Sequence, residues 1–136
     1  MNKKRLVLYI LIAVTVTGLA NFSIRKKFMA DEQYRAYVES EQRYAEAMTE
    51  DIYGGKTSDE TLNLFITSLE AGDIELASKY FILSSDLSRD KWVRIFTIFK
   101  EQGLLDEVVR DIEKDPNLLE LKLNGYSGVW KIVNFR

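Results

Sequence analysis

Carboxylates are the side chains in this sequence that are best suited to acid–base or metal chemistry. Glu107 and Asp111 are four residues apart, so a helix would place both on one polar face, where a hard cation could bind. A calcium loop needs oxygens from a tightly turning D-x-[DN]-x-[DN]-G series, which the sequence lacks. We therefore interpret these carboxylates as a solvated helix face, and we predict no catalytic residue, no metal site and no cofactor. The same stretch holds five acidic residues, Asp106, Glu107, Asp111, Glu113 and Asp115.

Missing residue types exclude most other kinds of catalysis. The chain has no histidine and no cysteine, which excludes Ser-His-Asp and Cys-His nucleophiles, thiol redox centres and ordinary zinc sites. The run Gly54-Gly55-Lys56-Thr57 resembles the end of a phosphate-binding loop, but the upstream glycine spacing is absent. Thr57 followed by Glu60 fits a helix capping box instead. We predict that the protein is not an enzyme.

Aromatic residues form the second group that could serve a function. A concave apolar surface near Trp92, Phe96 and Trp130, between helices and a hairpin, would suit a small hydrophobic ligand. The alternative, which the helical spacing of most of these residues favours, is that they form the core. The group comprises Phe65, Tyr80, Phe81, Trp92, Phe96, Phe99, Trp130 and Phe135.

The element most clearly indicated is a membrane segment near the N-terminus. Residues 6–24 carry no formal charge and are nearly all apolar in their centre. Nineteen residues of helix span roughly 28 Å, close to the ~30 Å of a bilayer's hydrocarbon core. We predict that residues 1–27 form an anchor with basic flanks and that residues 6–24 contact the lipid bilayer.

Retention of this segment competes with its cleavage as a secretory signal near Ala20. Arg25, Lys26 and Lys27 would follow the cut directly, and positive charge there resists translocation. The apolar stretch is also at the long end for a signal peptide. We therefore expect a single-pass signal-anchor with the N-terminus inside and the domain on the extracytoplasmic side of a prokaryotic-type membrane; secretion after cleavage is the alternative.

The charge distribution separates the anchor from the rest of the chain. Residues 1–27 hold six basic and no acidic side chains, which leaves 13 basic and 21 acidic residues for 28–136, a net charge of 13 − 21 = −8. Phosphate-backbone binding relies on clustered lysine and arginine. An acidic body is therefore not expected to bind nucleic acid.

Residues 28–55 are predicted to form a charged helical stalk that ends at Gly54-Gly55. Tyr34, Tyr37 and Tyr44 belong to a narrow apolar stripe at helical spacing. One interpretation is a face for self-association or for docking another envelope protein. The other is a linker helix that packs on its own domain.

Residues 56–136 are predicted to form one compact domain. Ser58–Ala71 has helical periodicity, Gly72 ends it, and Asp73 caps the helix that follows. Ser88 is a candidate cap for a third helix, which Gly103 ends, and a fourth ends at Asp115-Pro116. We expect a compact four-helix body.

The C-terminal segment changes to a strand pattern. Leu119, Leu121 and Leu123 alternate with polar residues, and residues 129–135 are rich in β-branched and aromatic types, which predicts a β-hairpin. A helix over residues 117–123, opened by Pro116, is the alternative. The fold class is mainly α, a small α+β arrangement with an N-terminal transmembrane helix.

Two stretches resemble known domains. The series Thr57-x-x-Glu60-Thr-Leu62 through Gly72-Asp73 to Tyr80-Phe81, together with Gly128-Val-Trp130-Lys-Ile132, is similar to extracytoplasmic domains like nuclear transport factor 2, found in membrane-anchored bacterial proteins of unknown function. The resemblance covers under a third of the chain. It implies helices packed on a curved sheet, and it marks packing positions without supplying a catalytic residue.

These patterns together predict a membrane-anchored, extracytoplasmic, non-catalytic interaction module. The alternative function is a small-molecule-binding domain with an apolar pocket between the helices and the hairpin.

Overall fold

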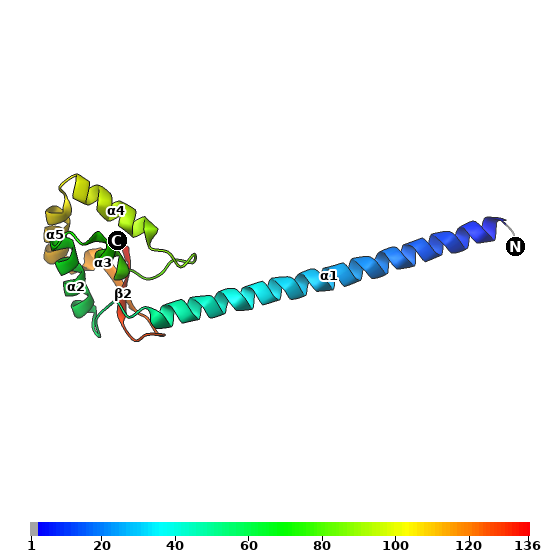
Figure 1. Cartoon of the computed structure of the whole chain (residues 1–136), viewed down its shortest axis with the longest axis horizontal. Coiled ribbons are helices and arrows are strands. Elements are labelled where there is room, and N and C mark those ends of the chain that lie inside the picture. The colour runs from blue at the N-terminus through cyan, green and yellow to red at the C-terminus, as the bar shows by residue number, and fades with distance from the viewer. Residues whose placement is uncertain (1–2) are drawn as a thin grey trace. The chain divides into compact units, whose positions relative to one another are not determined.

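A computed structural model describes the backbone of residues 3–136 and the side chains from Val7 onward (Figure 1). The chain is mainly helical and ends in a two-stranded antiparallel hairpin, as predicted. It divides into two compact units, one up to Gln42 and one from Arg43 to Arg136. The elements are α1 (Lys3–Glu50), α2 (Ser58–Glu70), α3 (Ile74–Lys79), α4 (Asp90–Glu101), α5 (Leu105–Lys114), the 3₁₀ helix η1 (Pro116–Leu118), β1 (Leu119–Leu123) and β2 (Trp130–Phe135).

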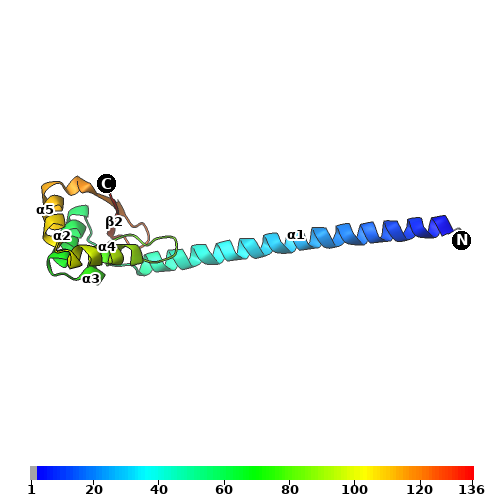
Figure 2. The same ribbon diagram turned by 90° about the horizontal axis from the view of Figure 1, so that it is seen from above.

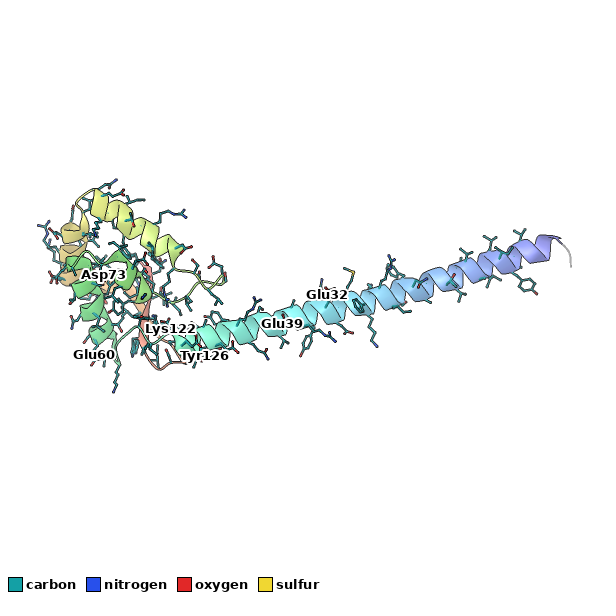
Figure 3. All side chains as sticks on the ribbon, in the orientation of Figure 1. Glu32, Glu39, Glu60, Asp73, Lys122 and Tyr126 are labelled. Carbon is teal, nitrogen blue, oxygen red and sulfur yellow. The ribbon has the colours of Figure 1, made fainter. Side chains whose placement is uncertain are left out.

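The first unit is the N-terminal part of α1. This helix is long and apolar enough to cross a membrane by length and composition, and none of its most apolar window is buried in the structure. The hydroxyls of Thr15 and Thr17 donate to carbonyl oxygens of the preceding turn, at 2.8–3.1 Å. The hydroxyls of these two threonines are therefore satisfied by their own helix. Further along, Glu32 and Glu39 project from α1 into solvent (Figure 3).

Caps define α2 and α3 as the sequence predicts. The Thr57 hydroxyl accepts from the Glu60 amide at 3.1 Å, and Asp73 accepts from the Leu76 amide at 2.9 Å. The Glu60 carboxylate reaches one residue beyond the expected cap, because it accepts from the Lys56 amide at 2.6 Å. Glu60 and Asp73 mark the starts of the two helices in Figure 3. Gly72, at φ +65°, allows the sharp reversal between them.

Helices α4 and α5 form the second helical pair, and both views show α4 running along the domain and α5 turned away from it (Figures 1 and 2). The N-cap position of α4 is Arg89, one residue after the predicted cap at Ser88, and the Arg89 side chain makes no capping hydrogen bond. The Ser88 hydroxyl nevertheless accepts from the Asp90 amide at 3.0 Å. Gly103 separates the helices at φ +70°. This pair carries most of the apolar surface discussed below.

The hairpin contains a bulge that decides which side chains reach the core. Glu120 pairs with Asn134 and Leu121 pairs with Ile132, so Val133 has no partner in the register. The extra residue resets the alternation. Consequently Ile132 and Phe135, which strict alternation would place on opposite faces, both pack against the core.

The alternative helix over residues 117–123 is wrong. Pro116 opens only the short η1, whose start Asp115 caps by accepting from the Asn117 amide at 3.1 Å. The chain is already extended at Leu119. Alternating leucines next to a cross-strand partner favour β structure over one more helical turn.

A segment after α3 extends the sheet on the other edge of β2. Phe81 forms an isolated parallel bridge with Ile132: the Ile82 amide donates to the Ile132 carbonyl at 2.8 Å, and the Ile132 amide donates to the Tyr80 carbonyl at 2.9 Å. The hairpin is therefore held by backbone hydrogen bonds to the helical layer as well as by side-chain packing. A two-stranded hairpin alone would be marginal in water.

The domain has one continuous hydrophobic core. Phe81 is fully buried at its centre and stacks on Trp92, with ring centroids 3.9 Å apart. Aromatic pairs of this kind add stability beyond the area they bury. The buried core residues of this cluster are Phe65, Leu69, Ile74, Ala77, Tyr80, Phe81, Trp92, Phe96, Val109, Ile112, Leu119 and Ile132.

The last turns of α1 belong to the domain. Met48 is buried, its carbonyl accepts from the Asn124 side-chain amide at 2.8 Å, and Tyr44 packs edge-on against Tyr126, with centroids 6.3 Å apart. The compact unit thus starts at Arg43, earlier than the predicted boundary between residues 55 and 56. Helix α1 also ends at Glu50 rather than at Gly54-Gly55.

Candidate functional site

An apolar groove lies between α4, α5, η1 and the end of β2. Its volume is about 480 Å³, within the ~300–1,000 Å³ that small-ligand sites occupy. Seven of the ten lining residues are apolar, and the polar ones are Lys91, Asp111 and Asn134. The apolar lining consists of Trp92, Ile95, Phe99, Val108, Ile112, Leu118 and Phe135.

Helical spacing produces the two walls of this groove. Trp92, Ile95 and Phe99 recur at three- and four-residue steps on α4, and Val108 and Ile112 do so on α5. Ile112 is almost fully buried, whereas Ile95, Phe99 and Val108 are only half-buried. The apolar faces of the two helices are therefore wider than the core they cover, and the surplus lines the groove.

A second, more polar cavity of about 410 Å³ adjoins the groove. The two share Lys91, Trp92 and Ile95, so one stretch of α4 forms the ridge between them. The Lys91 ammonium lies 4.6 Å from the centroid of the Trp92 ring, a cation–π contact at this boundary. The remaining lining residues of the polar cavity are Ser84, Asp86, Ser88, Asp90 and Arg94.

The three aromatic residues predicted to line a pocket have different environments. Trp92 lines the groove. Phe96 is fully buried behind it, with its ring centroid 6.2 Å from that of Trp92, and so contributes to the core. Trp130 is half-buried at the far end of β2, where its amide donates to the Gly55 carbonyl at 2.9 Å.

The three tyrosines predicted to form an interaction face also differ. Tyr34 and Tyr37 are 69% and 61% exposed on α1. Tyr44 is half-buried against Tyr126, so it contributes to the contact between the end of α1 and the hairpin. Only the first two tyrosines present open aromatic surface.

The carboxylates of α5 lie on its solvent side. The Asp111 side chain is 57% exposed and lies 4.0 Å from the ammonium of Lys114. Within the described part of the chain, no three acidic side chains converge as a metal ion would require. Asp111 instead contributes one charge to the edge of the groove.

The most unusual polar group is a fully buried lysine, which the sequence analysis did not single out. Lys131 on β2 donates from Nζ to Asp51 Oδ1 at 2.9 Å, to the Tyr53 carbonyl at 2.6 Å and to the Lys79 carbonyl at 2.5 Å. Three acceptors satisfy the three donors of an ammonium group. The other Asp51 oxygen accepts from Arg89 Nη2 at 2.5 Å. We call Asp51, Arg89 and Lys131 the buried charge cluster.

Burial dominates the electrostatics of this cluster. It lowers the pKa of Lys131 to about 8, against the opposing effect of the hydrogen bond and charge of Asp51. The pKa of Arg89 is lowered for the same reason. Lys131 is thus charged at neutral pH but has no access to solvent, so the cluster fits a structural role better than a catalytic one.

Comparison with known proteins found no match to the chain among protein-family models, curated proteins or solved structures. The resemblance to domains like nuclear transport factor 2 stays a prediction. The groove and the charge cluster must therefore be interpreted from their own geometry.

Proposed function

We propose that the protein is a single-pass membrane protein whose domain, a four-helix body with a C-terminal hairpin, is a non-catalytic module that binds another protein of the cell envelope. The observation that carries the proposal is the uncharged stretch of residues 6–24, which is helical and offers no polar face. Its apolar side chains from Val7 to Ile24 are all exposed in the structure. Lipid is the environment in which such a helix is stable.

The proposed orientation places the N-terminus inside and the domain on the extracytoplasmic side. Three basic residues flank each end of the stretch, so the charge balance across it is nearly even. The orientation follows from treating the stretch as an uncleaved signal, because a long downstream domain is translocated largely regardless of its charge. Cleavage near Ala20 would give a secreted form of the same domain.

The proposed interaction surface is the exposed aromatic side of α1 beyond the anchor. Tyr34 and Tyr37 present large apolar rings among charged neighbours, a composition typical of protein interfaces. The body carries an excess of acidic side chains. A partner with a basic, aromatic-binding surface is therefore the expected kind, and a second copy of this chain is the competing one.

Cell fractionation combined with protease accessibility and intact mass tests the membrane part of the proposal. We expect the full-length mass in the membrane fraction after a high-salt wash, and a domain that is cut by protease added from outside. Full-length protein in the soluble fraction would refute the anchor. A mass that begins after Ala20 would select the secreted form.

Site-specific photocrosslinking tests the interaction part. A photoreactive residue at position 37 is expected to give a discrete adduct in native membranes, whereas the same residue at position 122, an exposed position on β1, is the matched control (Figure 3). An adduct of twice the chain mass would identify self-association. If neither position 34 nor position 37 gives an adduct, the proposed surface is refuted.

The apolar groove favours a second function, binding of a small apolar ligand by the domain. Its support is a 480 Å³ volume bounded by seven apolar side chains. A hydrophobic fluorescent dye is expected to bind saturably to the full-length protein in nanodiscs. Val108→Arg, which places a charge on the wall formed by α5, should abolish that binding.

A further inference from the structure

We infer that the groove and the adjoining polar cavity together bind a single-chain amphiphile, with the acyl chain in the groove and an anionic carboxylate or phosphate at Lys91. The inference rests on the second proposed function and specifies its ligand. Three features of the described residues support it: the capacity of the groove, the change from apolar to polar lining at one ridge, and an available cation on that ridge.

The capacity of the groove suits one hydrocarbon chain. A water molecule takes up roughly 30 Å³, and a methylene group is of similar size. A groove of about 480 Å³ therefore has room for about 16 methylene groups. A two-chain lipid would need about twice as much space. Because removal of each methylene group from water is favourable, a chain that fills the groove gains free energy along its whole length.

The lining changes character at the ridge of α4. On one side Trp92, Ile95 and Phe99 of α4 face Val108 and Ile112 of α5 across the groove. On the other side Trp92 and Ile95 meet hydroxyl and charged groups in the polar cavity. A ligand that occupies both spaces must itself change from apolar to polar along its length. Amphiphiles have this property, whereas purely apolar compounds would leave the polar cavity to water.

Lys91 is the residue best placed to receive the head group. It lines both cavities, it is exposed, and among the described residues it forms no ion pair. Arg94, one turn further along α4, lines the polar cavity and is likewise in no described ion pair. Two cations at this point would stabilise a carboxylate or phosphate directly attached to the chain.

The acidic residues nearby define where that anion lies. Asp86 accepts from the Ser84 hydroxyl and from the Ser88 amide at 3.2 Å, so its carboxylate is engaged by its own loop, and these hydrogen bonds lower its pKa. Asp90 lines the polar cavity but not the groove, and Asp111 lines the groove but not the polar cavity. The ridge at Lys91 lies between the two carboxylates. The anion is therefore expected at the ridge rather than deep in either space.

Fluorescence quenching of Trp92 tests the inference directly. The full-length protein, carrying Trp130→Phe so that Trp92 is the sole tryptophan, is placed in phosphatidylcholine nanodiscs. The probes are palmitate brominated in its tail, the corresponding brominated alcohol, and the corresponding brominated alkyl phosphate. We expect saturable quenching by palmitate or by the alkyl phosphate, and the stronger of the two identifies whether the head is a carboxylate or a phosphate.

Two variants separate the parts of the inference. Lys91→Gln should weaken binding of the anionic probe about tenfold, the effect of losing one charge-assisted hydrogen bond, and leave the alcohol unchanged. Lys122→Gln, on β1, is the matched control and should change neither. Val108→Arg should abolish binding of every probe, and the thermal unfolding of each variant is measured in parallel to confirm that it folds.

Two kinds of result would overturn the inference. Saturable binding of the alcohol alone, or anionic binding that Lys91→Gln does not weaken, would overturn the amphiphile while the apolar-ligand function stands. Quenching that is non-saturable, or that Val108→Arg leaves intact, reflects partition into the nanodisc lipid and would overturn both.

Discussion

The ammonium group of Lys131 lies 2.9 Å from the carboxylate of Asp51, although 80 residues separate the two in sequence. The contact joins the C-terminal strand to the residue that follows α1. Both side chains are almost fully buried, at 0% and 3% exposure. Removal of one member of such a pair leaves the other charged and without its partner, which is far more costly than loss of a surface pair.

Asp51→Asn is therefore expected to destabilise the domain by about 3–5 kcal/mol. The amide keeps the shape of the side chain but leaves Lys131 and Arg89 without a counter-charge. Asp111→Asn, on a 57% exposed side chain, is the matched control and should change stability by less than about 0.5 kcal/mol. Urea unfolding followed by tryptophan fluorescence on the full chain in nanodiscs measures both. Equal effects would show that burial of the cluster does not matter.

The same lysine predicts an unusual dependence of stability on alkaline pH. Its pKa is about 8 in the folded protein and near the ordinary lysine value of 10.5 when unfolded. Between these values the unfolded chain binds more protons than the folded one, so the free energy of unfolding should rise with pH, by at most about 1.4 kcal/mol per pH unit. Below pH 8 both states are protonated and the contribution to the slope vanishes.

The window from pH 8 to 10 isolates this effect. Burial raises the pKa of Tyr80 above its usual value of 10, so Tyr80 opposes the trend only at higher pH. Unfolding free energies measured at intervals across the window should rise for the wild-type chain. Lys131→Met should remove that rise, whatever its effect on stability at neutral pH. An identical slope in both proteins would assign the pH dependence to other groups.

Gly54 is expected to tolerate no side chain. Its φ is +152°, and a Cβ there would lie 2.3 Å from the Trp130 carbonyl oxygen. Gly103 has a positive φ as well, yet a Cβ would meet nothing within 4 Å. Gly103→Ala should therefore cost only the ~1–2 kcal/mol of the left-handed conformation, whereas Gly54→Ala should cost more or prevent folding. Thermal unfolding of both variants compares them, and similar losses would contradict the predicted clash.

Thr57→Ala should destabilise the domain by about 1 kcal/mol through loss of the α2 cap. Thr67→Ala supplies the matched control, because Thr67 is exposed within the same helix and its hydroxyl only donates to the Asn63 carbonyl. Alanine has the higher helix propensity there, so that variant should be neutral or slightly stabilising. The difference in the urea midpoints measures the cap alone, and midpoints that shift equally would rule it out.

Local signals in the sequence were sufficient to predict most of the fold. Thr57 and Asp73 are caps that act within four residues, and the glycine at position 72 ends a helix by its own backbone freedom. The alternation of leucines over 119–123 likewise predicts a strand without knowledge of its partner. Such features depend on neighbours in the chain, which a sequence displays directly.

Features that depend on distant residues could not be predicted in this way. The bulge at Val133 changes which side chains face the core, and a pattern of alternation cannot place it. Phe81 ends up beside Ile132 because the segment after α3 pairs with β2. The groove is a further example, since it depends on how far apart α4 and α5 lie.

The burial of Lys131 had one signal that could have been used. In a strand rich in β-branched and aromatic residues, alternation places Lys131 on the face opposite Trp130 and Ile132. That face can be solvated or can hold a counter-charge. Only the return of the chain at Asp51 decides between the two, because it brings a carboxylate and two carbonyls to the same point.

The position of Asp51 bears on how the domain could be released if the protein is anchored as proposed. Each hydrogen bond described for the charge cluster involves residues from Asp51 onward, and the compact unit begins at Arg43. A proteolytic cut between Ile24 and Gln42 would therefore give a fragment that keeps every hydrogen bond of the charge cluster. A cut between Met48 and Asp51 would instead leave Met48 on the other side of the cut from the domain. The Met48 carbonyl accepts a hydrogen bond from the Asn124 side chain, so such a cut would separate two residues that are in contact in the intact protein.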